Sequence, residues 1–228
     1  MRQCTVYRLG LVGYQEAWDL QKALAERRKE GQIGDVLLLL EHPHTYTSGR
    51  NGKKENILAS EEELARLGAR VFWIDRGGDA TYHGPGQLVG YPILDVVPLG
   101  GPLPYVRALE ELLIRTLADF DIAAARIPGR TGVWAGDRKI AAIGVKLSRW
   151  ISTHGFALNL DPDLSYFDYI VPCDIQGVRV TSMAEMLRRP VGVAEVQDCL
   201  VQHFARVFWT QIEEGDLRDL EVMVKAMS

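Results

Sequence analysis

The sequence predicts an α+β fold, in which helices flank a mixed or antiparallel sheet. Two observations lead to this prediction. Between residues 131 and 160 the pattern is of strand type throughout, as in an antiparallel meander. Two segments with helical spacing of apolar residues follow it, at 182–188 and 193–209. A run of strands followed by a run of helices is typical of the α+β class.

The N-terminal part is predicted to contain both strands and helices. Ser60 and Glu63 form a capping-box pattern, which begins a helix because their side chains satisfy free backbone N–H groups. Gly68 is suited to end that helix, because glycine readily adopts the left-handed conformation found there. The expected elements are strand 4–9, helix 14–25, strand 36–40, helix 61–67 and strand 69–74.

The clearest helical pattern of the chain runs over 105–120, and Pro104 favours a helix start. Further on, a Gly136-Asp137 pair is typical of a hairpin turn between two strands. The elements expected in this part are loop 76–87, strand 88–96, helix 105–120, and strands 133–134, 140–147 and 156–160.

The composition is that of an ordinary globular protein. Its 228 residues, 47% of them hydrophobic, are enough to bury about 70 to 75% of the unfolded surface without disulfides. Three cysteines far apart in the sequence indicate a reducing compartment. The N-terminus has no apolar signal region. We therefore expect a cytoplasmic protein with a single domain over residues 1–228.

The charge is unevenly distributed along the chain. A net charge of -4 argues against general nucleic-acid binding. The segment 126–149, however, contains six basic residues and a single acid, Asp137. This segment predicts either a basic face for an acidic partner or a solvated strand surface.

Residues 76–87 are the densest group of unusual residues, with four glycines, an arginine and a histidine directly after a strand. Glycines let a ligand lie against bare backbone, whose N–H groups can bind an oxyanion or a carbonyl. The loop lacks the Gly-Lys-Ser/Thr ending of phosphate loops, and its glycine spacing differs from the dinucleotide fingerprint. It therefore indicates either a ligand-binding loop of another kind or a plain turn.

Cys173 lies between predicted elements, where a thiol can stand at the edge of a pocket. A nucleophilic cysteine needs a basic or cationic neighbour that raises its thiolate fraction. Lys139 is the candidate neighbour, because small or apolar residues follow it and desolvation makes a lysine a usable base. The plain alternatives are a small buried hydrophobe for the cysteine and an exposed lysine beside a turn.

The histidines offer two further interpretations. His42-Pro43-His44 together with His83 and His154 suggests a metal site, but no H-x-x-x-H pair or cysteine–histidine cluster supports it. A protease-like pair of Cys173 with His83 or His154 stays open, because sequence spacing does not exclude it.

Four blocks of residues occur in a characteristic order. They are Arg76-Gly77-Gly78-x-x-Thr81-Tyr82-His83-Gly84-Pro85-Gly86-Gln87 with Tyr91-Pro92-Ile93, Lys139-Ile140-Ala141-Ala142-Ile143-Gly144, His154-Gly155-Phe156-Ala157-Leu158-Asn159, and Pro172-Cys173 followed by Thr181-Ser182. In these blocks, and over nearly its whole length, the chain resembles the lipoyl(octanoyl) transferases, or octanoyl-acyl-carrier-protein:protein octanoyltransferases. The 34 residues that separate Lys139 from Cys173 also agree with this family.

The resemblance implies an ATP-independent acyltransferase with a thioester nucleophile at Cys173, an activating lysine at Lys139 and no cofactor. It implies octanoyl-acyl carrier protein as the donor. The implied acceptors are lysines of lipoyl domains, in 2-oxoacid dehydrogenase complexes and the glycine cleavage H protein, in the first step of endogenous protein lipoylation. The implied fold is the α/β catalytic domain shared with lipoate-protein ligases and biotin protein ligases. The residues implied to bind the acyl group are Arg76, Gly77, Gly78, Asp79, Ala80, Thr81, Tyr82, His83, Ala142, Ile143, Gly144, Gly155, Phe156 and Ala157.

One residue departs from the family pattern, because Asp174 follows Cys173 where the family often has glycine. A carboxylate that pointed at the thiol would oppose thiolate formation, so we expect Asp174 to face solvent. Two rival functions stay open on the sequence alone. One is an ATP-dependent ligase of related fold, and the other is a non-catalytic acyl-binding protein in which Cys173 is structural.

Overall fold

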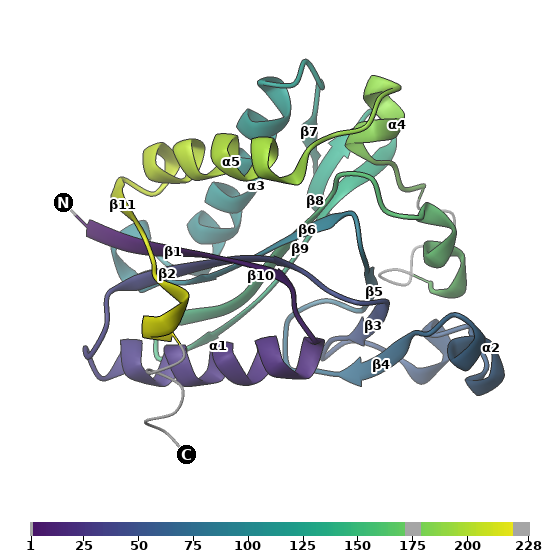
Figure 1. The fold of residues 1–228 in the computed structure, drawn as a ribbon, viewed down its shortest axis with the longest axis horizontal. Coiled ribbons are helices and arrows are strands. Elements are labelled where there is room, and N and C mark those ends of the chain that lie inside the picture. Colours follow the sequence, from purple (N-terminus) through teal and green to yellow (C-terminus); the bar gives the residue numbers. More distant parts are fainter. Residues whose placement is uncertain (1, 172–178, 221–228) are drawn as a thin grey trace.

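The computed structural model describes residues 2–171 and 179–220, and within these ranges its centre is a large mixed sheet of eight strands (Figure 1). In spatial order the strands are β11 (Thr210–Glu214), β1 (Arg2–Leu11), β2 (Asp35–Glu41), β6 (Gln87–Ile93), β10 (Ile151–Asn159), β9 (Arg138–Ser148), β8 (Arg130–Ala135) and β7 (Ala125–Ile127). Strand β1 pairs in parallel with β2 and β11, and every other neighbouring pair is antiparallel.

Helices cover both faces of this sheet. On one face lie α3 (Pro102–Ala118) and α5 (Val193–Val207), with α4 (Met183–Leu187) near the edge, and on the other lies α1 (Tyr14–Lys29) (Figure 1). Successive side chains of β2 point to opposite faces of the sheet and so contribute to two different cores. Leu37 and Leu39 belong to the core under α3 and α5, whereas Leu38 and Leu40 belong to the core over α1.

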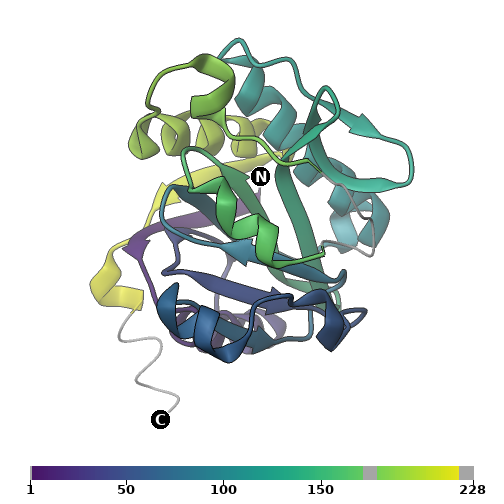
Figure 2. The ribbon, with the colours of Figure 1, turned by 90° about the vertical axis from the view of Figure 1, so that its right-hand side faces the viewer.

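A second sheet of three strands lies beside the large one. Its order is β4 (Arg70–Trp73), β3 (Thr45–Ser48) and β5 (Ala80–His83), with β3 parallel to β4 and antiparallel to β5. Helix α2 (Glu61–Arg66) and the 3-10 segment η3 (Leu164–Tyr169) accompany it (Figure 2). A core of its own, centred on Tyr46 and Tyr82, holds the small sheet together. The connection from β4 to β5 carries the glycine-rich segment to the large sheet.

The predicted α+β class and most of its elements are confirmed. The meander is formed by β8, β9 and β10, the turn at Gly136-Asp137 joins β8 to β9, and Ser60 and Glu63 make both hydrogen bonds of the capping box. Helix α3 begins at Pro102, three residues before the predicted start. Further 3-10 turns are η1 (Lys54–Asn56) and η2 (Val97–Leu99).

The prediction was wrong for the loop at 76–87, because Ala80–His83 form strand β5 within it. The short strands β3, β7 and β11 were not predicted. Each of these strands has only three to five residues. In addition, β3 and β11 pair with strands that are distant in sequence. Among the helices of the described residues, none is both long and apolar enough to pass through a bilayer.

Candidate active site

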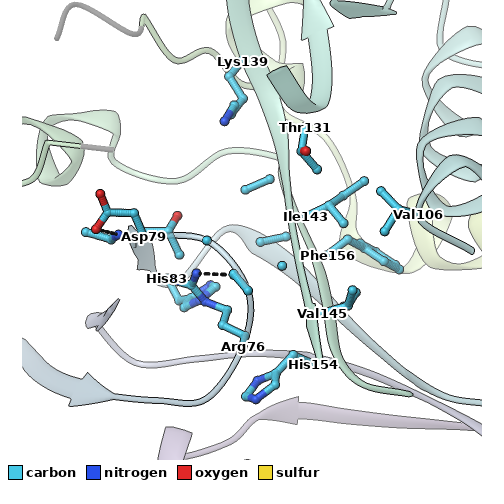
Figure 3. Close-up of a pocket in the computed structure, with 18 of the residues that line it drawn as sticks. Arg76, Asp79, His83, Val106, Thr131, Lys139, Ile143, Val145, His154 and Phe156 are labelled. Atoms are coloured by element: carbon cyan, nitrogen blue, oxygen red, sulfur yellow. Dashed lines mark hydrogen bonds between the residues drawn. The ribbon is translucent and has the colours of Figure 1, made fainter. Parts of the chain in front are cut away.

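A cavity of about 520 Å³ opens where the large sheet, the small sheet and the start of α3 meet (Figure 3). Its volume is in the range of small-molecule sites. The apolar part of its wall contains Val106 of α3, Ile143 of β9 and Phe156 of β10, and the polar part contains Arg76, His83 and His154. Figure 3 shows Lys139 at one end of this group and His154 at the other. A long apolar ligand fits such a wall if its reactive end lies near Lys139.

The glycine-rich segment reaches the cavity because it packs closely against β9. The N–H of Gly77 donates a hydrogen bond to the carbonyl oxygen of Val145 at 2.9 Å. A Cβ atom on Gly144 would lie 2.9 Å from Cδ of Arg76, and one on Gly49 would lie 2.4 Å from the oxygen of Gly78. A residue larger than glycine at 144 would push the segment away from β9 of the large sheet. One at 49 would push it away from the end of β3 in the small sheet.

The hydrogen bond of Gly77 also bears on the expected oxyanion donors. The N–H groups near Gly77-Gly78 and Gly144 are candidates from the sequence, because a loop of glycines exposes its backbone. The N–H of Gly77 already donates to Val145, and Gly77 in this conformation therefore offers no donor to a ligand.

Close approach of β10 to β6 shapes the floor of the cavity. A Cβ on Gly155 would lie 2.1 Å from the oxygen of Gly90, and a Cβ on Gly90 would lie 2.1 Å from the ring of Phe156. The two glycines therefore let the strands come together and let Phe156 fold over Gly90. The ring is buried and contributes to both the cavity wall and the main core.

Lys139 stands at the start of β9, on the rim of the cavity. Its Nζ lies 5.0 Å from the centre of the Trp134 ring, within the range of a cation–π contact. Its backbone N–H donates to the carbonyl oxygen of Arg179 at 2.8 Å, and its carbonyl oxygen accepts from the N–H of Thr181 at 3.0 Å. The side chain is half-buried, as the sequence pattern predicted for a partly desolvated lysine.

Cys173 and Asp174 lie outside the described residues, so their expected positions stay predictions. The residues before and after segment 172–178 are described. The N–H of Val171 donates to the carbonyl oxygen of Asn56 at 2.9 Å, and Val180 lines the cavity.

All of the predicted acyl-binding residues except Tyr82 line the cavity. The exception is Tyr82, whose side chain is fully buried in the core of the small sheet, and its part in acyl binding stays a prediction. Its hydroxyl group lies 2.8 Å from Nδ1 of His44. Its neighbours on the strand, Thr81 and His83, line the cavity, as does Ala80 at the start of β5.

The two histidines of the cavity wall are buried and held by hydrogen bonds. Nδ1 of His83 lies 2.8 Å from Oε1 of Gln87, and Nε2 of His154 lies 3.0 Å from Oδ1 of Asp75. Burial lowers the pKa of His83 well below its ordinary value, and burial also lowers the pKa of His154 although Asp75 opposes this. Both are therefore neutral near pH 7 and are weaker bases than an exposed histidine.

Several cavity residues were not among the predicted acyl-binding residues. They are Tyr14, Gln87, Tyr91, Leu103, Val106, Gly129, Arg130, Thr131, Trp134, Val145, His154, Asn159, Phe167 and Val180. Four of them belong to the motif blocks described above, and this membership could have identified them as site residues: Gln87, Tyr91, His154 and Asn159. The others come from separate elements that only tertiary packing brings together.

The basic segment 126–149 is less available to a partner than its composition suggests. Arg126 forms ion pairs with Glu110 and Glu111 at 3.0 and 2.8 Å, and Arg138 forms one with Glu185 at 2.6 Å. Lys146 pairs with Asp75 in the same way. Arg130 is exposed at the cavity rim, where its guanidinium group lies 5.6 Å from the Trp134 ring.

The chain is similar in sequence to a known protein family and to individual enzymes. The family described as the lipoyl protein ligase A/B catalytic domain matches residues 13–205. An octanoyltransferase of Solibacter usitatus is 55% identical over 91% of this chain and 94% of its own, and one of Chloroflexus aurantiacus is 51% identical over 91% and 95%.

Solved structures of related fold agree with the architecture. A putative lipoate protein ligase from T. acidophilum with bound lipoic acid superimposes with a TM-score of 0.78, at 16% identity, over 100% of this chain and 95% of its own. The biotin protein ligase of Aquifex aeolicus superimposes with a TM-score of 0.52, at 12% identity, over 92% and 70%. The predicted likeness to these two ligase folds is thereby confirmed.

Proposed function

This chain belongs to the octanoyltransferase family and is an acyltransferase of protein lipoylation, and from this premise we propose that it transfers its acyl group through a thioester on Cys173. The octanoyl group comes from acyl carrier protein and ends on a lysine of a lipoyl domain. Lys139 is the proton acceptor of both steps. Residues 1–228 act as one catalytic domain in the cytoplasm, in keeping with the few, widely separated cysteines.

The observation that supports this proposal most directly is the position of Lys139 at the cavity rim. Its backbone pairs with Arg179 and Thr181, the described residues that follow segment 172–178. On the other side of that segment, Val171 is bonded to Asn56, whose Nδ2 donates to Oδ2 of Asp79 in the cavity wall at 2.5 Å. The described residues on either side of segment 172–178 are thus bonded to Lys139 at one end and, through Asn56, to Asp79 at the other, and both of these line the cavity.

In the first step the thiol of Cys173 gives its proton to Lys139 and attacks the carbonyl carbon of the octanoyl thioester. The carrier thiolate leaves and takes the proton back. One thioester replaces another, so the step is close to balanced in free energy and needs no ATP. The apolar wall at Ile143 and Phe156 supports binding of the octanoyl chain, because burial of each CH₂ group contributes about 0.8 kcal/mol.

In the second step the amine of the acceptor lysine attacks the enzyme thioester. An alkyl ammonium group has no lone pair, so it must lose a proton before it can attack. The nitrogen loses two protons on the way to a neutral amide. Lys139 in its neutral form accepts one of them and returns it to the departing Cys173 thiolate, and the other goes to solvent. The product is an amide, which is more stable than a thioester, and the reaction is therefore driven toward the acylated acceptor.

The shift in the pKa of the Cys173 thiol that Lys139 has to produce is moderate. A free cysteine is only a few per cent thiolate at pH 7. A lowering of the thiol pKa by about two units corresponds to roughly 2.7 kcal/mol and makes the thiolate the main form. One cationic neighbour is enough for a shift of this size.

The acceptors that fit this chemistry are lipoyl domains of 2-oxoacid dehydrogenase complexes and the glycine cleavage H protein. Each supplies a lysine amine, which can attack a thioester held at the Lys139 end of the cavity. Binding of both partners at the rim in turn would suit a ping-pong reaction, in which the carrier leaves before the acceptor arrives.

The test is intact-mass measurement after incubation with octanoyl-acyl carrier protein in the absence of ATP. We expect one octanoyl group per chain, on Cys173 by peptide mapping, removed by hydroxylamine as a thioester is. The matched control is Cys199→Ala, which removes a partly exposed thiol and should be labelled like the unmodified protein.

Two outcomes would contradict the proposal. Labelling of Cys4 or Cys199, or no label at all, would show that Cys173 carries no acyl group. Full turnover by Cys173→Ala with an absolute requirement for ATP would instead indicate an adenylating ligase.

A further inference from the structure

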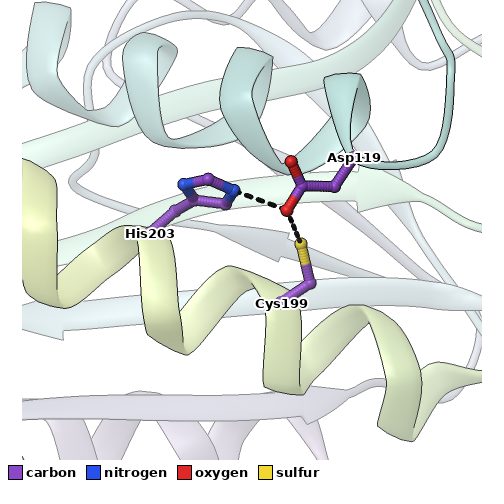
Figure 4. Close-up of side chains that lie close together, drawn as sticks. All are labelled: Asp119, Cys199 and His203. Atoms are coloured by element: carbon purple, nitrogen blue, oxygen red, sulfur yellow. Dashed lines mark hydrogen bonds and ion pairs between the residues drawn. The ribbon is translucent and has the colours of Figure 1, made fainter.

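Three side chains with metal-binding atoms meet where the C-terminal end of α3 lies beside α5 (Figure 4). Cys199 and His203 are four residues apart on α5, so both point to the same side of that helix. Asp119 is the residue at the C-terminal cap of α3. Among the described residues, these three form the group whose thiol, imidazole and carboxylate atoms all lie within 4.8 Å of one another.

We propose that Asp119, Cys199 and His203 form a zinc-binding site that joins the C-terminal end of α3 to α5. This site is independent of the proposed acyl transfer, and its donor set is one thiolate sulfur, one imidazole nitrogen and one carboxylate oxygen. Zinc accepts all three kinds of donor, and three protein ligands leave a fourth tetrahedral position for water.

The present geometry is close to what zinc requires. Nε2 of His203 lies 2.9 Å from Oδ2 of Asp119, and Sγ of Cys199 lies 3.2 Å from the same oxygen. With metal–ligand bonds of about 2.0 to 2.3 Å, the ligand atoms of a tetrahedral site are roughly 3.3 to 3.8 Å apart. Two of the three spacings are therefore within about 0.4 Å of tetrahedral values. The third, from Sγ of Cys199 to Nε2 of His203, is at most 4.8 Å.

The charges in and around the site also suit a divalent cation. A thiolate and a carboxylate together carry two negative charges, which balance those of Zn²⁺. Burial, Asp119 and Glu195 raise the pKa of the Cys199 thiol to about 12, against a smaller opposing effect of Arg206, so zinc has to displace the thiol proton when it binds. The Asp119 side chain is 57% exposed, which leaves a path for the ion from solvent.

The environment of His203 limits the expected affinity. Its Nδ1 is buried and has no hydrogen-bond partner within ranges 2–171 and 179–220. Zinc binding through Nε2 leaves the proton on Nδ1, so the imidazole receives none of the support that an outer hydrogen bond usually gives. We therefore expect binding in the micromolar range rather than the nanomolar range typical of closed structural sites.

The site is too far from the cavity to take part in acyl transfer. Val106 lines the cavity near the start of α3, and Asp119 follows the last residue of the same helix. Thirteen residues of helix separate them, which is roughly 20 Å. Zinc would act here on structure, by holding two helices together over the main core.

The experiment uses the full chain, freed of metal by a chelator, with Co²⁺ as a visible probe and Zn²⁺ as its competitor. We expect the unmodified protein and Cys173→Ala to show the thiolate-to-cobalt charge-transfer band, and added Zn²⁺ to abolish it. Cys199→Ala should lose the band and bind Zn²⁺ more than about 100-fold more weakly.

A second variant separates metal binding from the hydrogen bonds now present. Asp119→Asn keeps an oxygen that can accept from His203 but loses the carboxylate charge, and it should bind Zn²⁺ at least about 10-fold more weakly with the fold unchanged by circular dichroism. Zinc should raise the melting temperature of the unmodified protein but not of Cys199→Ala, because a ligand that binds only the folded state stabilises it.

The proposal is overturned if Cys199→Ala binds as tightly as the unmodified protein, or if the unmodified protein binds no zinc at millimolar concentration. A band that disappears only in Cys173→Ala also overturns it, because the metal would then lie at the proposed acyl site. Failure of the acyl-transfer proposal would leave each of these readouts unchanged.

Discussion

The ammonium group of Lys139 is subject to two opposing influences. Partial burial favours the neutral amine, which can accept a proton. The face of the Trp134 ring, 5.0 Å away, favours the charged form, which can stabilise a thiolate. The proposed mechanism uses both forms of this residue, the neutral amine as proton acceptor and the ammonium group beside the thiolate.

We expect the substitutions Lys139→Arg and Lys139→Ala to separate these two roles. Arginine keeps the positive charge but accepts no proton near neutral pH, whereas alanine removes both properties. Both variants should transfer the octanoyl group from pre-acylated enzyme to the acceptor about 100 to 10,000-fold more slowly, as for a lost acid–base group. Lys139→Arg alone should retain a lowered thiol pKa.

The measurements are thiol alkylation rate against pH and single-turnover transfer from pre-acylated enzyme. Near-normal transfer by Lys139→Ala would show that this lysine is not the base. His83, which lines the same cavity, would be the next residue to test, although burial makes it a weak base.

At the scale of secondary-structure elements, periodic segments were predicted well and short ones were not. Helices α3 and α5 and strands β8 to β10 have strong apolar patterns, because each covers or forms the main core. Strand β3 consists of Thr45-Tyr46-Thr47-Ser48, and strand β7 has three residues at the sheet edge. Such strands are defined by their partners, which local sequence does not reveal.

The same distinction applies to the site. The glycine-rich segment and the β9 and β10 residues were predicted through a family resemblance, since their motifs are contiguous in sequence. Tyr14, Val106 and Trp134 come from three different elements and meet only in the folded chain. Tyr82 is the predicted acyl-binding residue that does not line the cavity, because its side chain belongs to the core of the small sheet.

The hairpin of β7 and β8 is the element that we expect to meet the acidic acyl carrier protein. Arg130 on this hairpin is exposed at the cavity rim. Arg130→Glu should raise the apparent KM for the carrier several-fold more than it lowers kcat, because surface charges mainly affect association rate. The increase in KM should shrink at high salt, which screens the interaction.

A matched control for this prediction is Arg149→Glu. Arg149 is also exposed, but it lies in the turn after β9, four residues and about 13 Å beyond the cavity residue Val145. This variant changes the net charge equally and should leave KM nearly unchanged. Equal effects of the two variants would indicate general attraction rather than docking at the hairpin.

The whole molecule buries three histidines close to the cavity, and this arrangement affects its stability in acid. His42 is fully buried, with Nδ1 2.7 Å from the carbonyl oxygen of Val12 and Nε2 2.7 Å from the hydroxyl group of Tyr91. Burial lowers its pKa to about 4. His83 and His154 have pKa values shifted in the same direction, also chiefly by burial.

The sign of the effect follows from proton binding. Between pH 6.5, the ordinary histidine pKa, and about pH 4, the unfolded chain binds a proton at His42 that the folded chain does not. The free energy of unfolding therefore falls as the pH is lowered through this window. Asp75 affects the free energy of unfolding only at lower pH. Burial raises the pKa of its carboxyl group, but Lys146 and His154 together outweigh burial and lower this pKa below its ordinary value in the folded protein.

We predict that the free energy of unfolding, measured with urea, decreases between pH 7.5 and pH 5, with His42 alone accounting for about 2 kcal/mol. His42→Gln should be less stable at pH 7.5, since it disturbs two buried hydrogen bonds, but its stability should depend less steeply on pH. The two proteins should therefore approach each other in stability as the solution becomes more acidic. Parallel curves for the variant and the unmodified protein would show that protonation of His42 does not limit folding. The stability of this molecule in mild acid would then depend on other groups, and the cavity histidines would be the first to examine.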